Sequence, residues 1–376
     1  MSEPVLFAER NAATGKVGHI TLNAEASLNA LTLDMVDALQ ARLDAWREDD
    51  AIAAIFIDGA GERAFCAGGD VQALHASATQ TPGQAGAYAE AFFAREYRMN
   101  FELHTYPKPI ICWGHGVVMG GGLGILAGCS HRVVTGSTRI AMPEITIGLF
   151  PDVGGSWFLN HMPGSVGRFL ALTGASINAA DAIFTGLADR FINTQHKTAV
   201  LHGLLAVDWQ QEPDRHHALV RDVLRTFATR SQDDVPAAQV EPHLSRISEL
   251  CDGDDIHAVI DTLIGQQTSD RWLGKARDGL AHGSKFAACW IDRQLDSTRH
   301  SSLRECFQAE LVLVTNVVRS AEFAEGVRAL LIDKDRKPAW QYATSREVPA
   351  VEIDKLFHSP WAINPLADLG QEHPLK

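Results

Sequence analysis

Three consecutive glycines, at positions 120–122, lead directly into the apolar segment 123–127. A glycine in a helix costs roughly 0.5–1 kcal/mol relative to alanine, so a run of them needs a physical reason. One reason is the close packing of a buried helix against a neighbouring element. The other is chemical, because a helix that begins with unobstructed N–H groups supplies hydrogen-bond donors and a dipole for a developing negative charge. The run alone leaves both interpretations open.

Short apolar strands and amphipathic helices alternate on both sides of this run. Helical spacing of apolar residues predicts helices within residues 29–50 and over 87–103, and Thr32 is a candidate N-cap for the first. Strands are predicted at residues 16–22, 53–57, 110–113, 132–135 and 138–142. This alternation favours an α/β layout with crossover connections.

The pattern changes in the second half of the chain. Residues from about 197 to 330 show almost only helical periodicity, and prolines become frequent from residue 338. We therefore expect an α/β core at 1–196, a mostly helical region at 197–340 and an irregular tail at 341–376.

Composition excludes several classes of protein. The chain has 376 residues and a formal net charge of −13, which disfavours a nucleic-acid binder with a basic surface. The sequence contains no run of eighteen apolar residues, so no transmembrane helix is predicted and we expect no membrane association. The acidic start has no secretory pattern and does not resemble an Arg-rich transit peptide, so we expect a cytoplasmic location.

Several common catalytic motifs do not occur in the sequence. There is no GxSxG, P-loop, GxGxxG, HExxH or CxxC pattern, which weakens readings as a serine hydrolase, nucleotidase, dinucleotide enzyme or zinc enzyme. The six cysteines are dispersed along the chain, so buried and reduced thiols are expected.

The segment AFCAGGD, residues 64–70, follows a predicted strand. Gly68 and Gly69 would let a ligand approach the backbone closely, and N–H groups at such a turn can hold negative charge. An ordinary tight turn between a strand and a helix fits the same residues.

The segment 141–155 places two carboxylates, Glu144 and Asp152, among apolar residues, prolines and glycines. Burial would raise the pKa of either carboxyl group and favour acid–base or nucleophilic chemistry. Pro143 could instead place Glu144 at a helix start, where a negative charge is favoured without any catalytic role.

The order AFCAGGD, HGVVMGGG and MPEITIGLFPDVGG resembles the enoyl-CoA hydratase/isomerase (crotonase) superfamily. Residues 29–31 (NAL) and 172–189 (LTGASINAADAIFTGLAD) are also similar to it. More narrowly, the chain to about residue 340 resembles the 3-hydroxyisobutyryl-CoA hydrolase branch. That likeness rests on segments 92–100 (FFAREYRMN), 150–155 (FPDVGG) and 325–340 (EGVRALLIDKDRKPAW). The resemblance implies an α/β fold, a crotonase-like spiral of ββα units with a large helical C-terminal region.

The resemblance also implies roles for particular residues. Backbone N–H groups at the motif positions of Gly69 and Gly121 would hold the thioester carbonyl oxygen. Glu144 would be the central carboxylate, either attacking the thioester to form a mixed anhydride or acting as general base for water. Asp152 would assist water or proton handling, and Glu96 would contact the acyl end and its hydroxyl group.

The remaining substrate contacts are expected from Gly68, Asp70 and Gly120. One departure is informative, because hydratases of the superfamily carry a glutamate where this chain has Gly124. Hydration needs one group to activate water and another to deliver a proton, so the missing carboxylate argues against it.

The implied reaction is hydrolysis of 3-hydroxyisobutyryl-CoA, or of a short 3-hydroxyacyl analogue, within valine catabolism. Coenzyme A belongs to the substrate, so we expect no metal and no other cofactor, and a homo-oligomer is possible. One alternative is an enoyl-CoA hydratase or isomerase, since Glu144 alone could serve an isomerase. Another is a non-catalytic scaffold that binds acyl-CoA.

Overall fold

The computed structural model describes residues 3–80, 86–210 and 213–371. Their contacts form two compact units. Unit 1 comprises 1–69, 102–140 and 177–241, and unit 2 comprises 70–101, 141–176 and 242–376. This division differs from the consecutive segments expected from the sequence, because strands and helices far apart along the chain pack together in each unit.

Unit 1 is built around a six-stranded sheet with the order β1-β2-β3-β5-β7-β9. Strands β1 and β2 form an antiparallel pair, and the other neighbours are parallel. The strands are β1 (Val5–Asn11), β2 (Lys16–Leu22), β3 (Ile52–Gly59), β5 (Ile110–Gly114), β7 (His131–Val134) and β9 (Arg190–Phe191). Every residue of β3 and β5 is buried, which explains their continuous apolar sequences. Four of these strands confirm the sequence prediction, whereas β1 and β9 were not predicted.

A second sheet has three strands in the order β4-β6-β8. These are β4 (Ala64–Cys66), β6 (Val117–Met119) and β8 (Arg139–Ala141), the last confirming the strand predicted at 138–142. Strand β4 leads towards the AGGD glycines, and β6 leads into the triple glycine. The parallel pairing of β4 with β6 therefore brings the two glycine segments to neighbouring strand ends.

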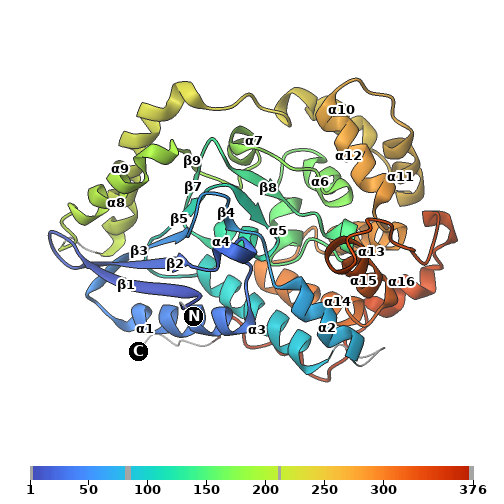
Figure 1. Cartoon of the computed structure of the whole chain (residues 1–376), viewed down its shortest axis with the longest axis horizontal. Helices are drawn as coiled ribbons and strands as arrows, with labels where there is room; N and C mark the ends of the chain where they lie inside the picture. The colour runs from blue at the N-terminus through green and yellow to red at the C-terminus, as the bar shows by residue number, and fades with distance from the viewer. Residues whose placement is uncertain (1–2, 81–85, 211–212, 372–376) are drawn as a thin grey trace. The chain divides into compact units, whose positions relative to one another are not determined.

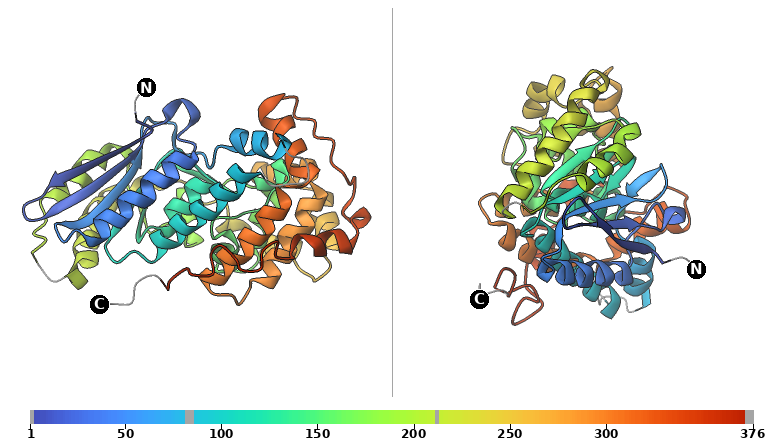
Figure 2. Two further views of the ribbon diagram at one scale, coloured as in Figure 1. Left: turned by 90° about the horizontal axis from the view of Figure 1, so that it is seen from below. Right: turned by 90° about the vertical axis from the view of Figure 1, so that its left-hand side faces the viewer.

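Helices cover the six-stranded sheet of unit 1. Helix α1 (Leu33–Glu48) runs alongside β1 and β2 (Figure 2), and Thr32 caps it by accepting a hydrogen bond from the Met35 N–H, as predicted. Helices α8 (Lys197–Leu205) and α9 (His216–Ser231) lie beside the sheet (Figure 1) and share one hydrophobic cluster with it. The shorter elements are η1 (Glu25–Ser27), α4 (Gly121–Gly128), α7 (Ala179–Phe184), η3 (Thr194–His196), η4 (Pro213–Arg215), η5 (Gln232–Asp234) and η6 (Glu241–His243, which ends in unit 2).

Unit 2 is mainly helical, and Figure 1 shows its C-terminal helices gathered together. Its helices are α2 (Val71–Gln80), α3 (Ala87–His104, which ends in unit 1), η2 (Glu144–Ile147), α5 (Gly155–Asn160), α6 (Val166–Thr173), α10 (Leu244–Leu250), α11 (Ile256–Gly265), α12 (Arg271–His282), α13 (Lys285–Ser297), α14 (Leu303–Val317), α15 (Ala321–Val327), the π-helical η7 (Arg328–Ile332), η8 (Ser345–Glu347) and α16 (Ala350–Leu356). The helical pattern expected from residue 197 to 330 is confirmed. The tail expected to be irregular contains η8 and α16, and its residues 372–376 lie outside the described part.

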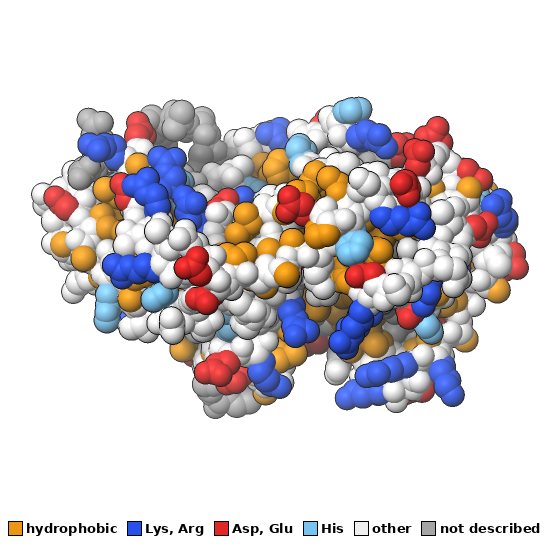
Figure 3. Space-filling view, turned by 90° about the horizontal axis from the view of Figure 1, so that it is seen from above, with side chains coloured by type: hydrophobic (Ala, Val, Ile, Leu, Met, Phe, Trp, Pro, Cys, Tyr) orange, Lys and Arg blue, Asp and Glu red, His pale blue; other side chains and the backbone are white. Residues whose placement is uncertain are grey.

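Basic, acidic and apolar side chains are mixed on the face drawn in Figure 3. No helix among the described residues is long and apolar enough to cross a membrane.

Candidate active site

The triple glycine starts helix α4 in unit 1. Gly120 is the N-cap with a φ of 47°, a left-handed value that favours glycine, and Gly121 is the first helical residue. All eight residues of α4 are buried. The Gly121 N–H has no acceptor within the helix, because the amides of a first turn lack helical partners. The structure thus confirms the predicted buried helix that begins with glycine amides.

The AGGD turn lies against this end of α4. Gly68 has a φ of 108°, and a Cβ built on it would lie 3.6 Å from the amide nitrogen of Gly121. The next residue, Gly69, forms a β-bridge with Leu31, whose N–H donates to the Gly68 carbonyl. Unit 1 therefore brings together the backbone segments of all four glycines singled out from the sequence.

Packing explains the third glycine of the run. A Cβ on Gly122 would lie 2.3 Å from the carbonyl oxygen of Cys66 on β4, closer than real atoms approach. The packing interpretation of the run is confirmed at Gly122. The chemical interpretation, in which the Gly121 amide holds a developing negative charge, stays a prediction. All six cysteines are buried and free, as predicted: Cys66, Cys112, Cys129, Cys251, Cys289 and Cys306.

Unit 2 holds the three predicted carboxyl groups, and all are buried. Glu144 begins η2 directly after Pro143, Asp152 precedes α5, and Glu96 lies on α3. Their exposed fractions are 6%, 5% and 2%. Oε2 of Glu144 and Oε1 of Glu96 have no hydrogen-bond partner among the described residues. Each can therefore accept a hydrogen bond from, or react with, a bound molecule.

Burial raises the pKa values of all three carboxyl groups, and charge repulsion adds to two of these shifts. Burial raises the pKa of Glu144 and of Glu96 well above the usual range for glutamate, and the neighbouring charge of Asp152 raises both pKa values further. Burial also raises the pKa of Asp152 to about 6, although the hydrogen bond from Tyr97 opposes that shift. Among the residues that the structure describes, no Lys or Arg contributes to these shifts. These directions agree with the effect expected of burial, and Asp152 can hold or release a proton near neutral pH.

Two buried residues of this cluster were missed from the sequence. The Tyr97 hydroxyl donates to Oδ2 of Asp152 at 2.7 Å, and Glu310 on α14 accepts hydrogen bonds from the turn that follows Asp152. Tyr97 directly follows Glu96, so the segment 92–100 already contained it. The signal for Glu310 was a carboxylate on the apolar face that also carries Phe307 and Leu311.

A further buried amide lies one helical turn after Glu96. Asn100 is fully buried, and neither its Oδ1 nor its Nδ2 has a partner among the described residues. Residues four apart share one face of a helix, so the Asn100 amide and the Glu96 carboxyl group lie on the same side of α3.

Asp70 has a local structural role in unit 2. Its Oδ1 accepts a hydrogen bond from the Ala73 N–H at 3.1 Å, in the first turn of α2. This contact accounts for an aspartate at that position, and the substrate contact expected of Asp70 stays a prediction.

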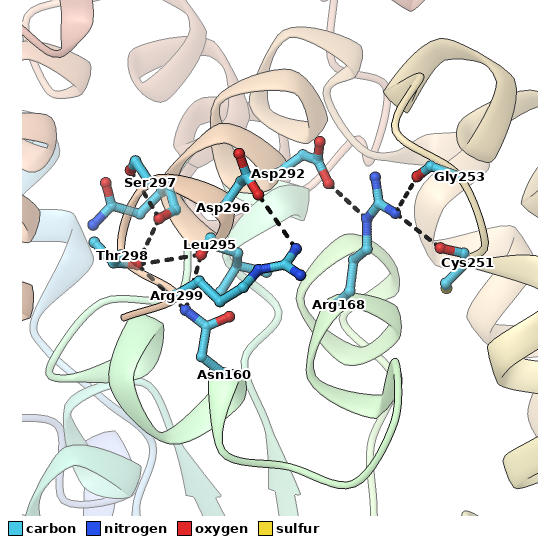
Figure 4. Close-up of polar contacts among 11 residues, drawn as sticks. Asn160, Arg168, Cys251, Gly253, Asp292, Leu295, Asp296, Ser297, Thr298 and Arg299 are labelled. Atoms are coloured by element: carbon cyan, nitrogen blue, oxygen red, sulfur yellow. Dashed lines mark hydrogen bonds and ion pairs between the residues drawn. The ribbon is translucent and has the colours of Figure 1, made fainter. Parts of the chain in front are cut away.

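Unit 2 also contains a polar cavity of about 580 Å³. Arg168 contributes to its wall, donating to Asp292 and to the carbonyl oxygens of Cys251 and Gly253 (Figure 4). Arg299 pairs with Asp296 in the same wall. Arg293, the third arginine of the lining, pairs with Asp354, so each of these arginines has a carboxylate partner in the protein. None of the cluster carboxylates lines the cavity.

Comparisons with known proteins agree with the sequence motifs. The profile of the enoyl-CoA hydratase/isomerase family matches residues 17–357. The chain is 35% identical to the mitochondrial 3-hydroxyisobutyryl-CoA hydrolase of Danio rerio, over 92% of this chain and 88% of that protein. It is 34% identical to the mitochondrial 3-hydroxyisobutyryl-CoA hydrolase of Homo sapiens, over 95% of this chain and 89% of that protein.

Solved structures of similar proteins confirm the expected fold. A carnitinyl-CoA dehydratase from Mycobacterium thermoresistibile has 33% identity and a TM-score of 0.85, covering 98% of this chain and 99% of its own. An enoyl-CoA hydratase from Rhodobacter sphaeroides has 31% identity and a TM-score of 0.81, covering 95% and 98%. The chain therefore belongs to the enoyl-CoA hydratase/isomerase (crotonase) family, in the branch of the 3-hydroxyisobutyryl-CoA hydrolases.

Proposed function

We propose that this protein hydrolyses the thioester of a short 3-hydroxyacyl-CoA, with 3-hydroxyisobutyryl-CoA as the first candidate substrate. The names of its relatives support the reaction class. The observation that carries the proposal is Glu144, a buried carboxyl group with an uncommitted oxygen and a raised pKa. A carboxylate of raised pKa is a stronger base and nucleophile once ionised.

The proposed roles of Gly69 and Gly121 rest on backbone amides. Attack on a thioester places negative charge on the carbonyl oxygen, and each amide would donate a hydrogen bond to it. Loss of one such donor typically costs about 10²–10³ in rate. The positive φ values of Gly68 and Gly120 are consistent with these roles, because each glycine allows a turn of the backbone directly before the amide concerned.

Two routes are proposed for Glu144. In the first, its carboxylate attacks the carbonyl carbon and the C–S bond breaks, so CoA leaves as a thiol after gaining a proton. Water then hydrolyses the resulting mixed anhydride and restores the carboxylate. In the second, Glu144 takes a proton from water, and that water attacks the thioester directly. Asp152 would exchange the proton with water or the leaving thiol in either route.

Glu96 is proposed to recognise the substrate hydroxyl group. Its Oε1 is buried and has no partner among the described residues, so it would accept a hydrogen bond from a 3-hydroxyl. An analogue without that hydroxyl would leave a buried polar atom unpaired, which is a strong basis for selectivity. The expectations of no metal or other cofactor, of a cytoplasmic location and of a homo-oligomer stay predictions.

Release of free thiol from 3-hydroxyisobutyryl-CoA tests the proposal. We compare the wild type with Glu144→Ala and, as a control, Asp292→Asn, which alters a carboxylate of unit 2 outside the cluster. Fast release that Glu144→Ala abolishes and Asp292→Asn retains supports the hydrolase reaction. No release by folded wild type would refute it for this substrate.

The second candidate is hydration or dehydration of an acyl-CoA, favoured by the names of the two solved relatives. Against it, Gly124 lies within α4 and supplies no carboxylate at the position where hydratases carry one. Loss of the enoyl absorbance of a short enoyl-CoA measures this activity in the same preparations. Hydration faster than thiol release would make the second candidate the better assignment.

A further inference from the structure

The turn that follows Asp152 has an unusual backbone. Val153 has a φ of 53° and Gly154 a φ of 85°, so two consecutive residues are left-handed. That conformation is rare for a β-branched residue, and strain of this kind costs on the order of 1–3 kcal/mol. Such a turn persists only where its surroundings hold it, so its supports determine where Asp152 lies.

Glu310 on α14 is the main support. Its Oε2 accepts a hydrogen bond from the Gly154 N–H at 2.7 Å, and its Oε1 accepts one from the Ser156 N–H at 2.9 Å. The Ser156 hydroxyl also lies 2.5 Å from Oε1. One carboxyl group therefore holds both ends of the segment 154–156, in which the Gly155 N–H donates back to the Asp152 carbonyl at 2.7 Å.

Burial of the Glu310 carboxyl group costs free energy, so a structural or functional role is expected for it. Glu310 is fully buried, and burial raises its pKa to about 8, against the effect of its Ser156 and Gly154 donors. The charge of Asp152 raises that pKa further. A buried carboxyl group without a cationic partner is stabilised only by its hydrogen bonds. Within the described part of the chain, the hydrogen bonds to Glu310 all come from Gly154 and Ser156 of the turn.

The same helix supports Asp152 from a second direction. Phe307, one turn before Glu310, packs against the Tyr97 ring with centroids 5.9 Å apart. A Cβ on Gly154 would lie 3.1 Å from the Phe307 ring, so the turn also rests on this side chain. Helix α14 therefore contacts both the turn and the tyrosine whose hydroxyl bonds to the Asp152 carboxylate.

We propose that Glu310 is a positioning residue, which sets the place of the Asp152 carboxylate by holding the strained turn at Val153 and Gly154. The inference rests on the proposed function, in which Asp152 handles a proton. Both oxygens of Glu310 are occupied by the turn and its side chain is fully buried, so it acts through Asp152 and does not touch the substrate.

The first test replaces Glu310 by glutamine. Glu310→Gln keeps the size of the side chain but turns an NH₂ group towards one of the two amides. A displacement of about 1 Å at a reacting group costs on the order of 100-fold in rate, so we expect kcat to fall about that far with KM unchanged. Ser156→Ala is the milder variant: it removes one hydroxyl contact and should lower kcat about 2–10-fold.

Asp181→Asn is the matched control. Asp181 is also fully buried, in unit 1, and its Oδ1 accepts hydrogen bonds from the Gln239 and Val240 amides at 2.7 and 2.8 Å. Its replacement should lower stability by a similar amount and leave kcat unchanged. Equal losses of kcat in Asp181→Asn and Glu310→Gln, or no loss in Glu310→Gln and Ser156→Ala, would overturn the proposal.

A double mutant separates positioning from general damage. If Glu310 acts through Asp152, then Glu310→Gln in an Asp152→Ala background should cause no further fall in kcat. Rate losses that multiply would overturn the proposal. In the Asp181→Asn background the Glu310→Gln loss should be fully retained.

Crystal structures of the wild type and Glu310→Gln test the inference without relying on turnover. We expect the 153–154 turn to move in the variant and the contact between Tyr97 and Asp152, 2.7 Å in the native chain, to be lost. Should Glu310→Gln not fold, Ser156→Ala takes its place. An unmoved turn overturns the positioning role, whereas inactive wild type with a moved turn counts only against the proposed thioester reaction.

Discussion

The close approach of α4 to β4 makes Gly122→Ala the sharpest test of the backbone-amide site. The new Cβ would stand 2.3 Å from the Cys66 carbonyl oxygen and 2.8 Å from its Cβ. An ordinary contact begins near 3.4 Å, so one backbone must retreat by about 1.1 Å from the other. Neither neighbour is the flexible end of a long side chain, so the start of α4 moves.

The expected losses follow from that displacement. Overpacking of a buried site typically costs about 1–3 kcal/mol of stability. The amide of Gly121 directly precedes the substituted residue, and misplacing a positioned donor by about 1 Å costs on the order of 100-fold in rate. We therefore expect kcat for thiol release to fall about 100-fold in a protein that still folds.

Gly136→Ala is the control for this prediction. A Cβ on Gly136, between β7 and β8, meets nothing within 4 Å, so both stability and kcat should stay at wild-type values. Urea denaturation and thiol release from 3-hydroxyisobutyryl-CoA are measured for both variants. Wild-type kcat in Gly122→Ala, at any stability, would refute a catalytic role for this helix start.

Three other substitutions probe the carboxyl cluster. Tyr97→Phe removes the hydrogen bond that lowers the pKa of Asp152, so the acid limb of the kcat–pH profile should move to higher pH; an unmoved limb would contradict the role of this contact. Burial raises the pKa of Asp152 from 3.8 to about 6, so this group favours the folded state below about pH 4 and loses that contribution as pH rises through 6. Asp152→Asn should therefore remove about 3 kcal/mol of the fall in the free energy of unfolding between about pH 4 and pH 8, measured by urea denaturation. An unchanged dependence of that free energy on pH would contradict this prediction. Glu96→Gln should lower the preference for 3-hydroxyisobutyryl-CoA over isobutyryl-CoA, measured as the ratio of kcat/KM values, by about tenfold; a retained ratio would remove Glu96 from hydroxyl recognition.

Local patterns in the sequence were enough to predict strands β2, β3, β5 and β7 and helix α1. Buried parallel strands read as continuous apolar runs, and α1 repeats its buried residues at helical spacing, so both were predicted. Strand β1 was missed because most of its side chains are exposed and its apolar residues do not alternate cleanly. It is a strand because its backbone pairs with β2 along the whole length of both strands.

The order of the motifs along the chain was enough to predict the principal candidate residues of the site. Glycines at 68–69 and 120–122, and the carboxylates Glu144 and Asp152, could be singled out because their residue types are unusual in apolar surroundings. The sequence could not divide the glycine run into a packing position and an amide position. That distinction depends on the distance of 2.3 Å between a Cβ on Gly122 and the Cys66 carbonyl oxygen. These two residues lie far apart in the chain.

The sequence by itself thus determined the family, several of the core strands and helices, and the principal candidate residues, because these are properties of local pattern. Only the tertiary structure decided that Glu310, 158 positions after Asp152, holds the turn on which that carboxylate depends. It also decided that the carboxyl groups of Asp152 and Glu310 are buried, which is the main reason that their pKa values rise. Burial and hydrogen bonding between distant segments are created by packing, and no local pattern records them.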